Sequence, residues 1–243
     1  MDLREAKNVT HRHPWEMSRG ASLLHILKEG MHEACYADIG SGDLFFAKKL
    51  KQITPKQIYA VDINYKSLGK KDNISKLKNL SSIPRKSVDC VLLLDVLEHI
   101  KDDEGFVGSL LEILKEEGVI LITVPAYQFL YSGHDMFLKH FRRYRKKNLI
   151  KILKKYNLTI KEDFYFYTVL FFTRCLQLAL TKCGLFKVKN QGIGNWRFSK
   201  RHLLTLLITN ILNIDFFINR TIAKLGISFG GLSICVVAQK ERT

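Results

Sequence analysis

Acidic residues are scarce in this sequence relative to basic ones. The 243 residues include 23 Asp and Glu against 39 Lys and Arg, which gives a net charge of +16. Such an imbalance points to anionic partners, such as nucleic acid, phosphorylated metabolites or an anionic membrane surface, unless the chain is simply lysine-rich throughout. It carries no information about the fold.

Paired cysteines and long apolar runs are also missing. The five cysteines show no CxxC spacing, and three of them lie in apolar, strand-like runs, which argues against a disulfide framework and fits a reducing compartment. The polar N-terminus has no signal-peptide core. The longest apolar stretch, Phe164–Leu180, is interrupted by an arginine and a glutamine and falls short of a membrane span. We therefore expect a cytoplasmic protein that could still touch a membrane at its periphery.

Short apolar segments alternate with helical segments between residues 35 and 125. Val88–Leu94 is strongly apolar, with Asp89 as its one charged residue, as is typical of a strand buried on both faces of a parallel sheet. Gly118 is expected to end the helical pattern that starts at Asp103. Further strands are predicted at Cys35–Ile39, Gln57–Val61, Ile74–Leu77, Val119–Val124, Thr159–Tyr165 and Leu232–Ala238. This order predicts βαβ units, right-handed crossovers and a doubly wound α/β fold.

A glycine turn follows the first predicted strand, in the segment Asp38-Ile-Gly40-Ser-Gly42. Glycines there permit a tight turn and let a ligand approach the backbone. Asp62 ends the next strand, where a carboxylate can accept hydrogen bonds from both hydroxyls of a ribose; the alternative is a turn or helix-capping residue. A dinucleotide fingerprint would need glycine at position 45, which is Phe45.

Ordered motifs along the chain resemble those of the class I S-adenosylmethionine (SAM)-dependent methyltransferases. They comprise the turn at 38–42, the segments 79–84, 87–100 and 114–125, and the final segment 229–240. The bacterial small-molecule branch, type 11 and related to the quinone methyltransferases, is the most similar. The resemblance implies a seven-stranded Rossmann-like sheet with an antiparallel last strand, and SAM as cofactor. It implies these cofactor-binding residues: Asp38, Gly40, Gly42, Asp62, Ile63, Asn79, Leu80, Asp95, His99, Trp15 and Arg19.

Two further segments resemble a bacterial subgroup of these enzymes. The first, around Trp15 and Arg19, is expected to form a helix across the cofactor mouth. The second lies after the fifth strand, where an acceptor should sit. His134 and His140 are its candidate general bases, because imidazole titrates near neutral pH, and Tyr131 could orient the acceptor, as could Tyr144. The alternatives are a helix-capping Asp135, a partly buried His140 and a solvated basic face through Arg142–Lys147.

We expect no bound metal ion. Asp95, Glu98 and His99 could form a cation site, since related quinone methyltransferases use a similar stretch. We favour the alternative in which Glu98 caps the next turn and His99 lines the cofactor pocket.

The chain is expected to form one methyltransferase domain, residues 1–243, with a helical cap at 1–33 and a helical insertion at 167–229. Insertions of about 65 residues are normally functional. This one could be a lid over an apolar substrate, an interfacial surface whose lysines and arginines meet anionic head groups, or a packed helical pair or dimer partner.

The expected function is methyl transfer from SAM to oxygen or nitrogen of a small-molecule or lipid-linked acceptor. The alternatives are an RNA-binding protein or RNA methyltransferase, and a non-catalytic scaffold of the same fold. We do not expect a nucleic-acid partner, because neither a base-flipping motif nor an appended RNA-binding domain is recognisable. A scaffold would be expected to lose Gly40, Gly42 or Asp62, and all three are present.

Overall fold

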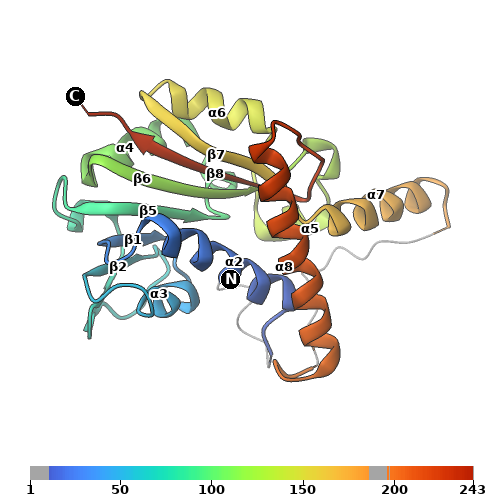
Figure 1. The fold of residues 1–243 in the computed structure, drawn as a ribbon, viewed down its shortest axis with the longest axis horizontal. Coiled ribbons are helices and arrows are strands. Elements are labelled where there is room, and N and C mark those ends of the chain that lie inside the picture. Colours follow the sequence, from blue (N-terminus) through green and yellow to red (C-terminus); the bar gives the residue numbers. More distant parts are fainter. Residues whose placement is uncertain (1–10, 186–195, 197, 243) are drawn as a thin grey trace.

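A single mixed sheet forms the centre of the computed structural model, which describes residues 11–185, 196 and 198–242 (Figure 1). The strand order is β3-β4-β2-β1-β5-β6-β8-β7. All strands run parallel except β8, which lies antiparallel between β6 and β7, and the short edge strand β3. The strands are β1 (Tyr36–Ile39), β2 (Ile58–Val61), β3 (Gly69–Lys71), β4 (Ile74–Leu77), β5 (Val88–Leu94), β6 (Leu114–Pro125), β7 (Leu158–Phe166) and β8 (Ser233–Lys240). The predicted doubly wound sheet with an antiparallel last strand is confirmed, and β3 is an additional strand at its edge.

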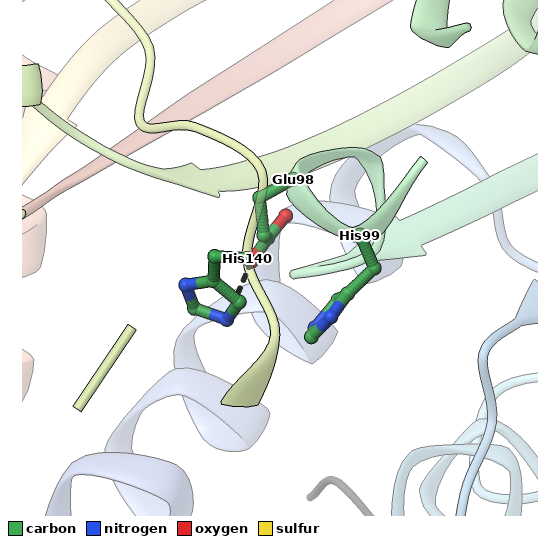
Figure 2. A group of neighbouring side chains, drawn as sticks. All are labelled: Glu98, His99 and His140. Carbon is green, nitrogen blue, oxygen red and sulfur yellow. Dashed lines mark ion pairs between the residues drawn. The ribbon is translucent and has the colours of Figure 1, made fainter. Parts of the chain in front are cut away.

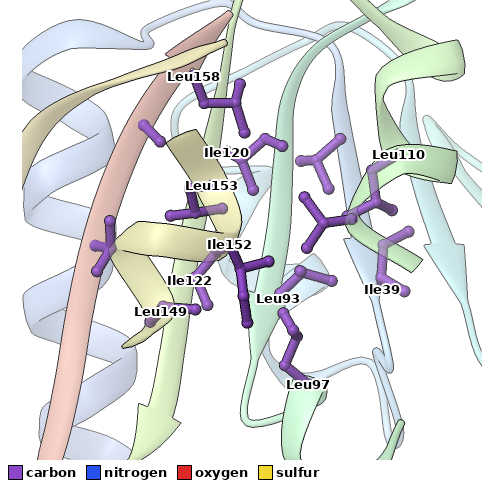
Figure 3. Packing of buried hydrophobic residues seen from close by; sticks show 14 of the residues in the cluster. Ile39, Leu93, Leu97, Leu110, Ile120, Ile122, Leu149, Ile152, Leu153 and Leu158 are labelled. Carbon is purple, nitrogen blue, oxygen red and sulfur yellow. The ribbon is translucent and has the colours of Figure 1, made fainter. Parts of the chain in front are cut away.

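Helices cover both faces of the sheet. They are α2 (Pro14–Gly30), α3 (Phe45–Leu50), α4 (Asp103–Ile113), α5 (Gly133–Leu138), α6 (Lys146–Lys154), α7 (Thr168–Lys182) and α8 (Leu203–Lys224). Short 3₁₀ turns lie at η1 (Leu80–Ser82), η2 (Leu97–His99) and η3 (Gln128–Leu130). Side chains of α4 and α6 pack on one face, as Figure 3 shows, while those of α2, α3 and α8 pack on the other. The central strand β5 is apolar from Cys90 to Leu94 because successive side chains enter opposite cores, while Asp89 near its start pairs with Lys115 (2.6 Å).

One local prediction was wrong, and one helix was not predicted. The helix α4 ends at Ile113, and Gly118 lies within β6 instead of ending the helix. A Cβ on Gly118 would lie 2.7 Å from the Leu114 side chain, so this glycine permits a close approach inside the strand. Helix α5 was not predicted, although Ser132 and Asp135 form a capping box at its start.

The predicted cap and insertion contain the helices that depart from the plain sheet-and-helix core. The cap contains α2, and the insertion contains α7, which projects away from the sheet, and α8, which lies along α2 and β7 (Figure 1). Lys187, Lys189 and Arg197, three of the basic residues that suggested a contact with anionic head groups, lie outside the described residues.

Candidate functional site

The glycine turn lies at the carboxyl end of β1. Gly40 and Gly42 have positive φ values of 68° and 50°, and the Gly40 amide donates to the Val61 carbonyl at the end of β2 (2.8 Å). A Cβ on Gly40 would lie 2.6 Å from Cγ2 of Val96. The turn therefore requires glycine at position 40 for both its backbone conformation and its space.

Asp62, directly after β2, organises this turn. Its Oδ2 accepts from the Gly42 amide (3.0 Å) and its Oδ1 from the Asn64 amide (2.8 Å). Asp62 is thus a turn residue, the alternative weighed from the sequence. Each carboxylate oxygen still has a second lone pair, so the predicted acceptance of two ribose hydroxyls is compatible with these bonds.

Asp38 supplies a buried negative charge beside the turn. It is 2% exposed, and Oδ2 has no hydrogen-bond partner among the described residues. Burial raises its pKa to about 7, against the opposing charge of Arg19. Leaving a buried carboxylate oxygen unpaired is costly, and a cationic ligand group would relieve that cost. The ammonium and sulfonium groups of SAM fit this requirement, whereas a pyrophosphate does not.

Helix α2 closes the mouth of the cavity next to Asp38. Arg19 pairs with Asp95, and its guanidinium lies over the Trp15 ring, 4.7 Å from its centroid. Arg12 pairs with Glu16 and with an acidic side chain of the glycine turn, and also stacks on a phenylalanine of α3. The cavity has a volume of only about 30 Å³, room for one or two waters. Arg12 and its neighbours must therefore move for SAM to enter.

Three more of the residues predicted to bind the cofactor, Ile63, Asn79 and Leu80, lie along the adjoining strand ends. Asn79 follows β4, and its Oδ1 accepts from the hydroxyls of Ser81 (2.8 Å) and Ser82 (3.0 Å). Ile63 is 82% exposed beside Asp62, while the neighbouring Leu80 packs partly against the core. The cofactor contacts of these residues stay a prediction, and Asn79 would have to share its Oδ1 between the two serines and the cofactor.

A buried ion-pair network organises the loop after β6. Asp135, fully buried, accepts from Nδ1 of His140 (2.9 Å) and from Nε and Nη2 of Arg143 (2.8 and 3.0 Å). It also accepts from the amide and hydroxyl of Ser132. Burial raises the pKa of Asp135, but these bonds outweigh it and hold the pKa well below its usual range. The side chain of Arg143 is 8% exposed, so the alternative of a solvated basic face does not hold for this residue.

Glu98, His99 and His140 converge beside this network (Figure 2). Oε1 of Glu98 lies 4.0 Å from Nε2 of His140, and the two imidazole rings meet edge to face with centroids 4.6 Å apart. Glu98 is fully buried, and burial raises its pKa to about 8 against the charges of Arg19 and Arg143.

These contacts correct two expectations for the stretch after β5. Glu98 does not cap the next helix, because its carboxylate oxygens have no hydrogen-bond partner among the described residues, and Asp102 caps α4 instead. Asp95 pairs with Arg19, whereas Glu98 and His99 converge with His140, so the three-residue cation group considered but not favoured from the sequence does not form as a unit.

The remaining acceptor-loop candidates have different environments. His134 is partly buried, and burial lowers its pKa, against the charge of Asp135. The Tyr131 hydroxyl donates to the His140 carbonyl (2.7 Å), so Tyr131 holds the loop backbone. The Tyr144 hydroxyl is buried against Asp103 (2.7 Å) and cannot orient an acceptor in this arrangement.

Sequence reasoning missed the contribution of two arginines, Arg12 at the cofactor mouth and Arg143 beneath His140. The Ser132-to-Asp135 spacing was a signal for α5 and hence for a fixed loop. Arg12 has a local partner in Glu16, but its contact with the glycine turn, like the pairing of Arg143 with Asp135, is formed only by the fold.

Comparison with known proteins supports one assignment. The methyltransferase domain family matches residues 17–162, whereas no curated protein matches the sequence. A SAM-dependent methyltransferase from Archaeoglobus fulgidus has 21% identity, covers 91% of this chain and 94% of its own, and has a TM-score of 0.54. A SAM-dependent methyltransferase from Mesorhizobium loti has 12% identity and a TM-score of 0.57, and the match covers 92% of this chain and 100% of that one.

A third solved structure is a phosphoethanolamine N-methyltransferase 2 from Haemonchus contortus, in complex with phosphomonomethylethanolamine and S-adenosylhomocysteine (SAH). It has 16% identity and a TM-score of 0.56, and the match covers 91% of this chain and 53% of that one. At these identities the structures show a shared fold and leave the branch a prediction. The family match spans more than half of the sequence, and the glycine turn and the buried carboxylate suit a cationic cofactor. The chain therefore belongs to the class I SAM-dependent methyltransferases.

Proposed function

We propose that this methyltransferase methylates an oxygen or nitrogen of a small-molecule or lipid-linked acceptor, with His140 as general base. The hydrogen bond between His140 and the buried Asp135 carries the proposal. When Nδ1–H donates a hydrogen bond to the Asp135 carboxylate, Nε2 keeps a lone pair that can accept a proton from the acceptor.

Asp135 is suited to support this proton transfer. Arg143 and Ser132 keep the carboxylate ionised and fixed, so it can hold the imidazole ring in one orientation. The same carboxylate stabilises the positive charge that His140 gains when it takes up the acceptor proton. Tyr131 holds the His140 carbonyl from the other side of the loop, which limits movement of the base.

The position of His140 suits an acceptor that approaches from the carboxyl ends of the strands. The amide of Phe141 donates to the Glu98 carbonyl (2.8 Å), which ties the loop to η2, just after Asp95 at the end of β5. When bound, SAM supplies an electrophilic methyl group on a sulfonium. In-line displacement then requires mainly positioning and removal of the acceptor proton, which the loop can provide.

A small or lipid-linked acceptor is supported by the surroundings of this loop. Tyr127 and Phe129 in the loop contact Phe171 of α7, with centroids 5.3 and 6.4 Å from it, which gives the loop an aromatic border. The neighbour from Haemonchus contortus acts on phosphoethanolamine, a small amine. The proposal includes a cytoplasmic location, which five free cysteines support. An RNA acceptor has only the net charge in its favour.

The test compares His140→Ala with His134→Ala, and uses the exposed His32→Ala as a control. Methyl transfer from isotope-labelled SAM is measured with aqueous and organic-phase cell extracts, and SAH affinity is measured by calorimetry. We expect His140→Ala to lower turnover about 10²–10⁴-fold with unchanged SAH affinity, and to abolish the rise of rate with pH that a general base produces.

The three variants separate the possible bases. Loss of activity in His134→Ala alone would assign the base to His134, and full activity in both variants would exclude imidazole catalysis. Unchanged activity in His32→Ala shows that removing a surface imidazole has no effect of its own.

A further inference from the structure

The outer sides of α7 and α8 expose two apolar stripes. We name this surface the α7–α8 face; its residues are Val169, Phe172 and Leu176 on α7 and Leu203, Leu207, Ile211, Ile214 and Ile218 on α8. Within each helix their spacing of three or four residues places them on one side. Four of them are strongly exposed: Leu203 (79%), Phe172 (64%), Leu176 (61%) and Ile214 (59%). A row of single exposed apolar residues needs no explanation, but a continuous face of this kind indicates an interaction surface.

A groove between the two helices extends the apolar character inward. It has a volume of about 390 Å³, and its lining includes Val169, Ile211 and Phe229. Polar residues at its floor are already engaged, because the Asp215 carboxylate accepts from the amides of Thr168 and Val169 (3.0 and 3.2 Å). The groove therefore offers an occupant almost only apolar contact.

The charge around the α7–α8 face has one sign. Asp215 is the single acidic residue in the sequence between Asp163 and Glu241, and its side chain is 9% exposed. Exposed basic residues lie near the helix ends: Lys182, Lys200, Arg201 and Lys224. The described part of the insertion thus presents an apolar face bordered by cations without an exposed carboxylate. This combination is complementary to an anionic lipid surface.

Helix α8 has the length and composition of a membrane span, with a mean hydropathy of 1.3 over its most apolar window. Its inner side nevertheless belongs to the folded domain. Phe216 is fully buried, and Arg220 pairs with Glu162 of β7 (2.7 Å) and with Glu29 of α2 (2.6 Å). Crossing a bilayer would break these pairs and leave a buried charge uncompensated. Only the outer side is available, so α8 can lie along a surface.

We propose that the α7–α8 face docks on the surface of an anionic phospholipid bilayer. The exposed apolar side chains enter the boundary between head groups and acyl chains, while the basic residues at the helix ends meet the phosphates. Helix α7 contacts the acceptor loop through Phe171, which meets Tyr127 and Phe129, so docking brings the bilayer within one helix of this loop. In this respect the inference rests on the proposed function, since it would favour a lipid-linked acceptor.

Vesicle co-sedimentation of the full chain tests the docking without any methyl transfer. The vesicles contain phosphatidylcholine alone or with one quarter phosphatidylglycerol, in 0.1 M and 1 M NaCl. The Debye length falls from about 10 Å to about 3 Å between these salt concentrations. We expect binding to the anionic vesicles that is at least tenfold stronger than to the neutral ones, and that weakens severalfold in high salt.

Two double variants probe the two contributions. Phe172→Asn with Leu176→Asn removes exposed apolar surface, and Lys200→Glu with Arg201→Glu reverses two charges. Each basic residue near such a surface contributes about fivefold to binding, so the charge reversal should cost at least about tenfold. Burial of a phenylalanine and a leucine side chain contributes at least as much, so loss of the apolar pair should also cost at least about tenfold. The matched control, Lys151→Glu with Lys154→Glu on the exposed side of α6, changes the net charge equally and should cost less than threefold.

Three outcomes would overturn the proposal. The first is no sedimentation of the wild-type chain with anionic vesicles in 0.1 M NaCl. The second is equal losses in the charge-reversal variant and its α6 control. The third is a dimer in solution that the Phe172 and Leu176 substitutions dissociate, because that would assign the face to a second copy of the chain. Unchanged thermal unfolding and SAH affinity in the variants verify that the fold and the cofactor site are intact. The assay can fail while the His140 experiment succeeds, and the reverse.

Discussion

Replacing Asp62 with asparagine is the most direct test of the cofactor site. The substitution keeps the shape of the side chain but removes its charge and one of its two acceptor oxygens. In the structure these oxygens accept from the amides of Gly42 and Asn64, so one of the two bonds is lost in either orientation of the new amide. Asp62→Asn therefore perturbs both the glycine turn and the predicted ribose contact.

The magnitude follows from the bonds involved. Hydrogen bonds to a charged group contribute about 1.5–3 kcal/mol each, and replacing the carboxylate with a neutral acceptor forfeits part of two of them. We expect SAH binding to weaken by about 2 kcal/mol, or roughly 30-fold. The amide left without an acceptor should lower the free energy of unfolding by about 1–3 kcal/mol.

Calorimetric titration with SAH measures the first effect, and denaturant unfolding measures the second. Asp72→Asn is the control, since Asp72 is an exposed aspartate at the sheet edge that pairs with Lys51. An SAH dissociation constant unchanged by Asp62→Asn would refute the assignment of this carboxylate to the ribose.

Three further predictions concern neighbouring residues. Gly40→Ala should lower the free energy of unfolding by about 2–4 kcal/mol, because the residue has a positive φ and its new Cβ would clash with Val96. Adding Val96→Ala should restore part of this loss, as measured by denaturant unfolding. No restoration would argue against the clash. Because burial raises the pKa of Glu98 from 4.5 to about 8, the folded state holds its proton more tightly than the unfolded state does, and this contribution to stability is lost as pH rises across that interval. Thermal unfolding at pH 5 and pH 8 should therefore show a smaller pH dependence in Glu98→Gln, and equal slopes would contradict the raised pKa. Asp135→Asn should lower turnover about 10²–10⁴-fold at unchanged SAH affinity, and a fully active variant would show that His140 needs no anionic partner.

The sequence was informative about the carboxyl ends of the strands. The glycines at 40 and 42 and the carboxylates at 38 and 62 could be recognised from the sequence, because a tight turn and a strand end restrict the residue type at those positions directly. The apolar run Cys90–Leu94 within β5 identified the central strand, because both faces of the strand are buried.

Side-chain partners distant in sequence were beyond local patterns. Nothing near Glu98 indicates that it is buried without a capping role, and the neighbouring Asp102 takes that role by a short-range bond instead. Arg143 looked solvated because it stands in a basic run, yet Asp135 draws it inward. The end of α4 was misplaced because Gly118 suits a helix terminus and a crowded strand equally well.

The contacts between α2 and α8 have a consequence for how the chain folds during synthesis. Ser22 bonds to Asn213, and Glu29 to Arg220, each pair being 191 residues apart in the chain. Pairings this distant slow folding, and the apolar side of α2 has no α8 to cover it until its partners, 191 residues downstream, have been synthesised. A chain shortened before α8 would thus carry the complete glycine turn while the helix bordering the cofactor cavity lacked its support.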